Sequence, residues 1–121
     1  MTQERLDKLS AFILEQLSSM IVMGELKDPR IGSFLTVSHV KLARDFSLAR
    51  VFISGFSDDV DVDKAVAALN NAAGYIRSVF AKKLKTRVVP KFVFQKDMSI
   101  EEGLEITKKI EELFKNKDSN T

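Results

Sequence analysis

Two strand-like runs separated by a very short turn constrain the fold of this chain most strongly. Residues 34–42 and 48–56 are rich in β-branched and aromatic side chains. In the second run, apolar and other side chains alternate, with Ala49, Val51 and Ile53 on one face and Arg50, Phe52 and Ser54 on the other. The connection Ala43-Arg44-Asp45-Phe46 is short enough only for a hairpin. We therefore expect an antiparallel pair with one buried face.

Three helices are predicted before the last strand. The first carries a stripe with spacings of three and four residues, and Gly24 suits its C-terminal cap before Pro29 ends any continuation. A second spans about Val62–Asn71, preceded by acids that suit its positive end. A third begins near Gly74. The predicted inward-facing residues are Leu6, Leu9, Ile13, Leu17 and Met20 in the first helix and Ile76, Val79, Phe80 and Leu84 in the third.

The C-terminal third of the chain predicts one strand and one further helix. Pro90 opens a strand in which Phe92 and Phe94 share a face. Ser99 and Glu102 have the spacing of a capping box for a last helix, whose predicted apolar stripe is Leu104, Thr107, Ile110 and Phe114. At 121 residues the chain suits a single domain, which we place at residues 1–115, with a flexible polar tail at 116–121.

The predicted order is helix, strand, strand, helix, helix, strand, helix. A hairpin followed by a helical crossover gives an α+β fold with a three-stranded mixed sheet and helices on one face. This is the type II KH topology (α-β-β-α-kink-α-β) with an additional C-terminal helix.

A local run of cations is the clearest functional signal. Seven Lys and Arg residues and no acid lie between Tyr75 and Lys96, although the whole chain has a formal charge of only +2. Such a patch is typical of a polyanion-binding surface. The alternative is an ordinary solvated helix face with counter-charges elsewhere in the fold. Lys82 and Lys85 share the helix face opposite Ile76 and Phe80, and Arg77 lies at its border.

Composition excludes several kinds of site. The chain has no cysteine, so disulfides and thiolate sites are impossible, and its single histidine, His39, lies within a predicted strand where a structural role is the default. We find no metal-binding cluster, no Gly-rich phosphate loop and no nucleophile–base set, and we expect neither cofactor nor catalysis. No apolar run approaches a membrane span and the N-terminus does not resemble a secretory signal, so we expect a cytoplasmic protein.

Several short motifs, in their order and spacing, resemble the ribosome-binding factor A family, from the first helix to about Gly103. The residues that carry this resemblance are Asp28-Pro29-Arg30, Thr36-Val37, Ala43-Arg44-Asp45-Phe46-Ser47, Ala72-Ala73-Gly74-Tyr75-Ile76-Arg77, Leu84-Lys85-Thr86-Arg87-Val88-Val89-Pro90-Lys91-Phe92 and Asp97-Met98-Ser99-Ile100-Glu101. The family replaces the Gly-x-x-Gly loop of most KH domains by an interrupted helix, which Ala72, Ala73 and Gly74 match here. These small residues could instead merely allow close helix packing.

The resemblance implies a non-catalytic, monomeric binding module without a small-molecule substrate, which acts in assembly of the small ribosomal subunit. It implies binding to the free 30S subunit through 16S rRNA, a part in late maturation that includes 5′-end processing, and a link to growth in the cold. The residues chosen as RNA contacts are Arg77, Lys82, Lys85 and Arg87, with Arg30, Arg44 and Arg50 as additions, and Tyr75 as a base-stacking residue or a partly buried one. Two other functions remain open: a KH-like module for another structured RNA, and a protein-interaction domain.

Overall fold

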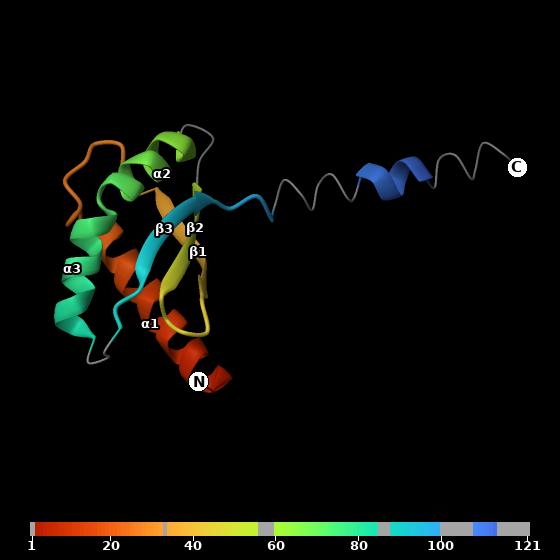
Figure 1. Ribbon diagram of the computed structural model, residues 1–121. Coiled ribbons are helices and arrows are strands. Elements are labelled where there is room, and N and C mark those ends of the chain that lie inside the picture. The colour runs from red at the N-terminus through yellow and green to blue at the C-terminus, as the bar shows by residue number, and fades with distance from the viewer. Residues whose placement is uncertain (1, 33, 56–59, 85–87, 100–107, 114–121) are drawn as a thin grey trace, which may run out of the picture.

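The predicted element order is present in the computed structural model, which describes residues 2–32, 34–55, 60–84, 88–99 and 108–113 (Figure 1). Its elements are α1 (Gln3–Val22), β1 (Leu35–Leu42), β2 (Leu48–Gly55), α2 (Val62–Asn71), α3 (Ala73–Lys83) and β3 (Lys91–Lys96). Within these ranges, no helix is both long and apolar enough to cross a membrane.

The three strands form a mixed sheet in the order β1-β2-β3. β1 pairs antiparallel with β2, and β3 adds parallel to β2, as the hairpin and crossover predict. The register is irregular between Val37 and His39, where Ser38 is the extra residue of a bulge. In the hairpin turn, the Phe46 N–H donates to the Ala43 carbonyl over 2.9 Å, and Phe46 itself is buried at a positive φ of 65°. The hairpin is therefore confirmed.

The core lies between one face of the sheet and the helices (Figure 1). The buried side chains alternate along each strand, as expected of a half-covered sheet, and they are Leu35, Val37 and Val40 in β1, Ala49, Val51 and Ile53 in β2, and Phe92 and Phe94 in β3. At the centre, the Phe80 ring lies 5.0 Å from the Phe92 ring and 6.4 Å from the Phe12 ring. α3, β3 and α1 therefore share one aromatic cluster.

Helix α1 ends at the predicted glycine. Gly24 has a φ of +68°, its N–H donates to the Ile21 carbonyl, and the Glu25 N–H donates to the Met20 carbonyl over 3.0 Å. These two bonds are the Schellman pattern, in which a left-handed residue satisfies the last carbonyls of a helix. Of the predicted stripe, Leu9 is partly buried and the other four residues are buried.

The outer edge of β3 is held by one side chain of α2. The Asn70 amide donates to the Phe94 carbonyl over 2.9 Å, and the Phe94 N–H donates to the Asn70 side-chain oxygen over 2.8 Å. Because β3 is an edge strand, these backbone groups have no strand partner on that side. Asn70 supplies that partner.

The predicted last helix is described only in part. Residues 108–113 are helical, and Ile110 and Leu113 are exposed there. Glu102, Leu104, Thr107 and Phe114 lie outside the described residues, as does the predicted boundary between domain and tail.

Candidate nucleic-acid interface

The junction between α2 and α3 is the centre of the predicted site. Ala72 caps both helices, with φ −88° and ψ 0°, and its N–H donates to the Ala68 and Leu69 carbonyls. Gly74, the predicted point of bending, lies in the first turn of α3 instead. The break therefore falls two residues earlier, because alanine can adopt this backbone conformation and the turn needs no glycine.

Gly74 is exposed, and a Cβ added to it would meet nothing within 4 Å. The alternative that this glycine serves close helix packing therefore has no contact to support it among the described residues. Its open surroundings instead leave room for another molecule to approach the start of α3.

A hollow of about 420 Å³ lies beside the junction. It is lined by Glu25, Leu26, Lys27, Asp28, Ile31, Ala72 and Tyr75. Leu26 and Ile31 are buried and give the hollow an apolar floor, whereas Tyr75 is 57% exposed. Of the two roles considered for Tyr75, its exposure at the rim favours stacking on a base.

Arg30, beside this hollow in the sequence, is already paired. Its guanidinium donates to both oxygens of Asp28, over 2.8 and 3.0 Å, and its backbone N–H donates to the same carboxylate. The side-chain hydrogen bonds from Arg30 lower the pKa of Asp28 from 3.8 to about 2. Asp28 thus balances the charge of Arg30 and leaves it a weaker phosphate contact than predicted.

The cations of α3 have different roles. The Arg77 guanidinium donates through Nε and Nη2 to the Val89 carbonyl, over 3.3 and 3.1 Å, and so links α3 to the segment before β3. Lys83, on the core side by periodicity, reaches out to donate to Gln16 on α1 over 2.9 Å. Lys82 is exposed in the last turn. Arg77 is therefore a structural link as well as a candidate contact.

Two predicted contacts of this group lie beyond what the structure describes. α3 ends at Lys83, with Leu84 extended. Lys85 and Arg87 lie outside the described residues.

Arg44 and Arg50 are not part of the junction. Arg44 is exposed in the hairpin turn, and Arg50 is exposed on the face of β2 that points away from the helices. They line other hollows than the one at Tyr75. The structure also adds two cations that the sequence did not single out: Lys27 at the junction, and Lys41 opposite Arg50 in the sheet register. The hairpin register could have revealed the second.

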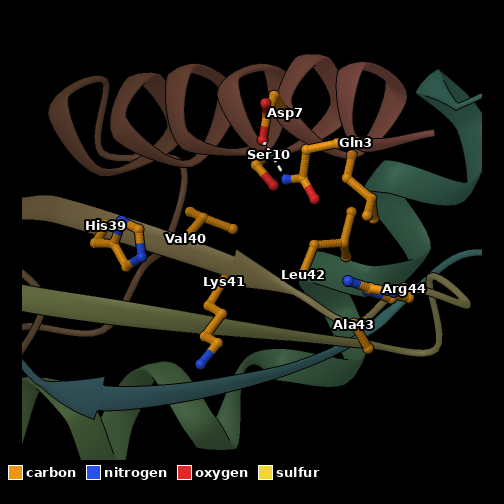
Figure 2. A pocket seen from close by; sticks show the side chains of 10 residues that line it. Gln3, Asp7, Ser10, His39, Val40, Lys41, Leu42, Ala43 and Arg44 are labelled. Carbon is orange, nitrogen blue, oxygen red and sulfur yellow. Dashed lines mark hydrogen bonds between the residues drawn. The ribbon is translucent and has the colours of Figure 1, made fainter.

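A third hollow, of about 440 Å³, lies between α1 and β1 (Figure 2). Ser10, Asp7 and His39 all line it, but Asp7 accepts a 2.9 Å hydrogen bond from Gln3 and the His39 ring lies 5.6 Å from the Phe52 ring. Among the described residues, no hydrogen bond joins the three into a nucleophile–base relay. The described residues also bring together no group of three potential metal ligands.

Comparisons with known proteins agree with this architecture. The sequence profile of the family named ribosome-binding factor A matches residues 5–110. A ribosome-binding factor A from Borreliella burgdorferi (strain ZS7) is 43% identical over 106 residues, which are 88% of this chain and 88% of that protein.

Two structures from Thermus thermophilus are similar in fold. The crystal structure of its ribosome-binding factor A has a TM-score of 0.64 at 27% identity, covering 75% of this chain and 93% of the other. A homology model of the same factor, fitted into a cryo-EM map of a 30S–RbfA complex, has a TM-score of 0.51 at 25% identity and covers 72% and 93% of the two chains. With this fold, the interrupted helix pair and a profile match over most of its length, the chain belongs to the ribosome-binding factor A family.

Proposed function

We propose that this protein is an assembly factor of the small ribosomal subunit. It binds the free 30S subunit through 16S rRNA and promotes late maturation, including processing of the rRNA 5′ end, and it supports growth in the cold. It acts as a monomer in the cytoplasm and by binding alone. Family membership supports the ribosomal target, and so does the 30S complex of the Thermus thermophilus factor.

The observation that carries the proposal is the exposed junction of α2 and α3. There an exposed aromatic ring, Tyr75, lies at the rim of a hollow, and an exposed glycine, Gly74, leaves the start of α3 open. Lys82 follows on the same helix. A ribose-phosphate chain could pass close to Gly74, with a base on Tyr75 and a phosphate at Lys82.

Sedimentation of a cell extract through a sucrose gradient tests the target. We expect the protein to travel with free small subunits and to be nearly absent from translating ribosomes. Its presence mainly on large subunits or polysomes, or on no particle, would contradict the assignment and leave the other RNA or a protein as its target.

The junction is tested by charge and ring variants. Lys82→Glu and Tyr75→Ala should each weaken small-subunit binding. Lys64→Glu on α2 is the control for a charge reversal at an exposed helical lysine away from the junction, one whose ammonium lies 3.9 Å from the Asp61 carboxylate. The side chains of Lys64, Tyr75 and Lys82 are all exposed, so each substitution should change the free energy of unfolding by no more than about 0.5 kcal/mol. If Lys64→Glu weakened binding as much as Lys82→Glu, binding would depend on the overall charge of the protein and not on a cation at the junction.

The maturation step needs a cellular readout. In cells lacking the protein, 16S rRNA with an unprocessed 5′ end should accumulate, and the excess should be larger at low temperature, where RNA helices rearrange slowly. Expression of the Lys82→Glu variant should restore processing less well than expression of Lys64→Glu. Normal 5′ ends in the deletion strain at every temperature would contradict this part of the proposal.

A further inference from the structure

The face of the sheet that points away from the helices is not covered by any helix of the described core (Figure 1). Six of its side chains matter here: the cations Lys41, Arg50 and Lys91, the rings of His39 and Phe52, and the apolar Val93. Figure 2 shows Lys41 on the opposite side of β1 from Val40 and Leu42, which point toward α1. We call this surface the open sheet face.

The cations gather at the hairpin end of the open sheet face. Lys41 and Arg50 are directly opposite in the antiparallel register, and Lys91 follows beside Leu48 on the parallel side. None of the three forms an ion pair with a residue that the structure describes. Like charges directly opposite in a sheet destabilise it. An anion placed between Lys41 and Arg50 would relieve that repulsion.

There is space for such an anion. A hollow of about 270 Å³ lies between the two cations, lined by Lys41, Leu42, Ala43, Leu48 and Arg50. The strand residues of the open sheet face include no acid within the described ranges. The site is therefore both positively charged and recessed.

The acids nearest to this face in the chain have other partners. Asp45, in the hairpin turn, accepts hydrogen bonds from the hydroxyl and the backbone N–H of Ser47, over 2.6 and 3.1 Å. Asp97, which follows β3, accepts hydrogen bonds from the Ser38 hydroxyl over 2.6 Å and the Ser99 N–H over 2.9 Å. Asp7, on α1 in the hollow beside β1, accepts a hydrogen bond from Gln3. These carboxylates are engaged locally and do not pair with Lys41, Arg50 or Lys91.

Two rings lie one row further along the sheet. His39 and Phe52 are cross-strand partners, and their ring centroids are 5.6 Å apart. Val93 on β3, which is 41% exposed, pairs with Arg50 in the cation row. In the row of the rings, His39 is exposed and Phe52 partly so. At about 3.4 Å per residue, this row is about 7 Å from the row of Lys41 and Arg50. One nucleotide can span a phosphate site and a stacking site that far apart.

We propose that the open sheet face is a second RNA-binding surface, which takes a single-stranded segment. Lys41 and Arg50 bind its phosphate, Lys91 adds charge, and a base stacks on His39 and Phe52. Aromatic rings on a sheet, bordered by cations, are a known way to bind unpaired bases. Only the source of the RNA, the small subunit, rests on the proposed function. With the junction on the other side, the protein could contact two RNA segments at once.

Binding of a short oligouridylate to the full chain tests this proposal by NMR and by fluorescence polarisation. The amide signals of Lys41, Arg50, His39 and Phe52 should shift on titration. The double variant Lys41→Gln/Arg50→Gln should bind at least about tenfold more weakly, and its log–log salt slope should fall by about 0.7, since the two cations share one phosphate and each single-strand phosphate contact contributes about 0.7. His39→Ala should also weaken binding.

The control is Lys64→Gln, which removes an exposed cation from α2 and should leave binding unchanged. Because the double variant removes like-charge repulsion, it should resist urea at least as well as the original chain, so that lost binding is not unfolding. Signal shifts confined to α2 and α3, unchanged binding of the double variant, or no binding of the oligonucleotide would overturn the proposal. Sedimentation with small subunits tests the proposed function, whereas the oligonucleotide experiment tests the open sheet face, so that either proposal can fail without the other.

Discussion

At the scale of single residues, carboxylates determine which cations are available to bind RNA. Asp28 accepts hydrogen bonds from the Nε and Nη2 of Arg30, whereas Lys82, Lys41 and Arg50 have no such carboxylate partner among the described residues. A count of basic residues therefore overstates the surface that an RNA can use. Arg30 in particular serves first to fix the turn after α1.

The pairing of Arg30 predicts the acid titration of Asp28. Its folded pKa, about 2, is below the ordinary 3.8, so the pair stabilises the fold above pH 3.8 and loses that contribution as pH falls from 3.8 through about 2. Carboxyl NMR should show a midpoint near 2 that returns toward 3.8 in Arg30→Ala. Asp45, whose pKa is lowered by Ser47, should not respond to this substitution. An unchanged Asp28 midpoint would contradict the pair.

A second residue-scale prediction concerns Asn70. Asn70→Ala leaves the N–H and carbonyl of Phe94 without their partner and should lower the free energy of unfolding by about 1–3 kcal/mol. Asn71→Ala, at the next position and exposed, is the matched control and should change it by no more than about 0.5 kcal/mol. Urea unfolding measures both. Equal effects would mean that Asn70 acts through helix propensity alone.

At the scale of elements, the chain ends its helices in two ways. α1 stops at a left-handed glycine, which satisfies the last carbonyls. α2 stops at Ala72, whose right-handed backbone passes directly into α3. The first ending needs its glycine, whereas the second does not. The glycine at position 74 is therefore available for a role other than turning the chain.

The same substitution at two glycines separates these cases. At both sites an added Cβ would meet nothing within 4 Å, so only backbone conformation differs. Gly24→Ala should lower stability by about 1 kcal/mol, because its φ is +68°. Gly74→Ala should raise it by up to about 1 kcal/mol, because the position is helical. Thermal unfolding of the two variants measures both changes in stability.

Small-subunit binding by the same two variants tests the function of the junction. If RNA passes close to Gly74, Gly74→Ala should bind the subunit more weakly although it is more stable. Gly24→Ala, provided it is measured well below its unfolding temperature, should bind as the original chain does. Undiminished binding by Gly74→Ala would mean that the RNA keeps its distance from this position.

At the scale of the whole molecule, an aromatic cluster joins elements from both ends of the described core. Phe80 of α3 lies between Phe12 of α1 and Phe92 of β3, and it is fully buried. The ring of Phe80 therefore contributes to the packing of both α1 and the helix pair α2–α3. We therefore expect the junction and the open sheet face to unfold together, as one cooperative unit.

Removal of that ring should weaken the entire fold. Phe80→Ala should lower the free energy of unfolding by about 3–5 kcal/mol, a large share of the about 5–15 kcal/mol typical of a domain. Val93→Ala removes an exposed apolar side chain from β3, on the side of the sheet away from Phe80, and should change the free energy of unfolding by about 1 kcal/mol or less. Urea unfolding, followed by circular dichroism and by Tyr75 fluorescence, should give coincident transitions. Separate transitions would contradict a single unit.

Features that depend on neighbours along the chain could be predicted from the amino-acid sequence. Apolar periodicity located the helices, the bounds of α2 were predicted as they are found, and the short turn fixed the hairpin. Gly24 was predicted as a cap, since a left-handed position favours glycine. These signals are local because backbone conformation and side-chain direction repeat with a fixed period.

Contacts between residues that are distant in the sequence depend on the folded packing, and the fold was needed to find them. It placed Asn70 on the edge of β3, Arg77 on the carbonyl of Val89 and Lys83 on Gln16. It also divided the predicted cations between the junction and the sheet, while Lys85 and Arg87 stay predictions. Hydrogen bonds and charge pairs between separate elements depend on how those elements pack. The apolar periodicity of one element predicts its buried face but not the partner that packs against it. For that reason the sequence predicted a basic protein surface, but the fold determined which of its cations lie together.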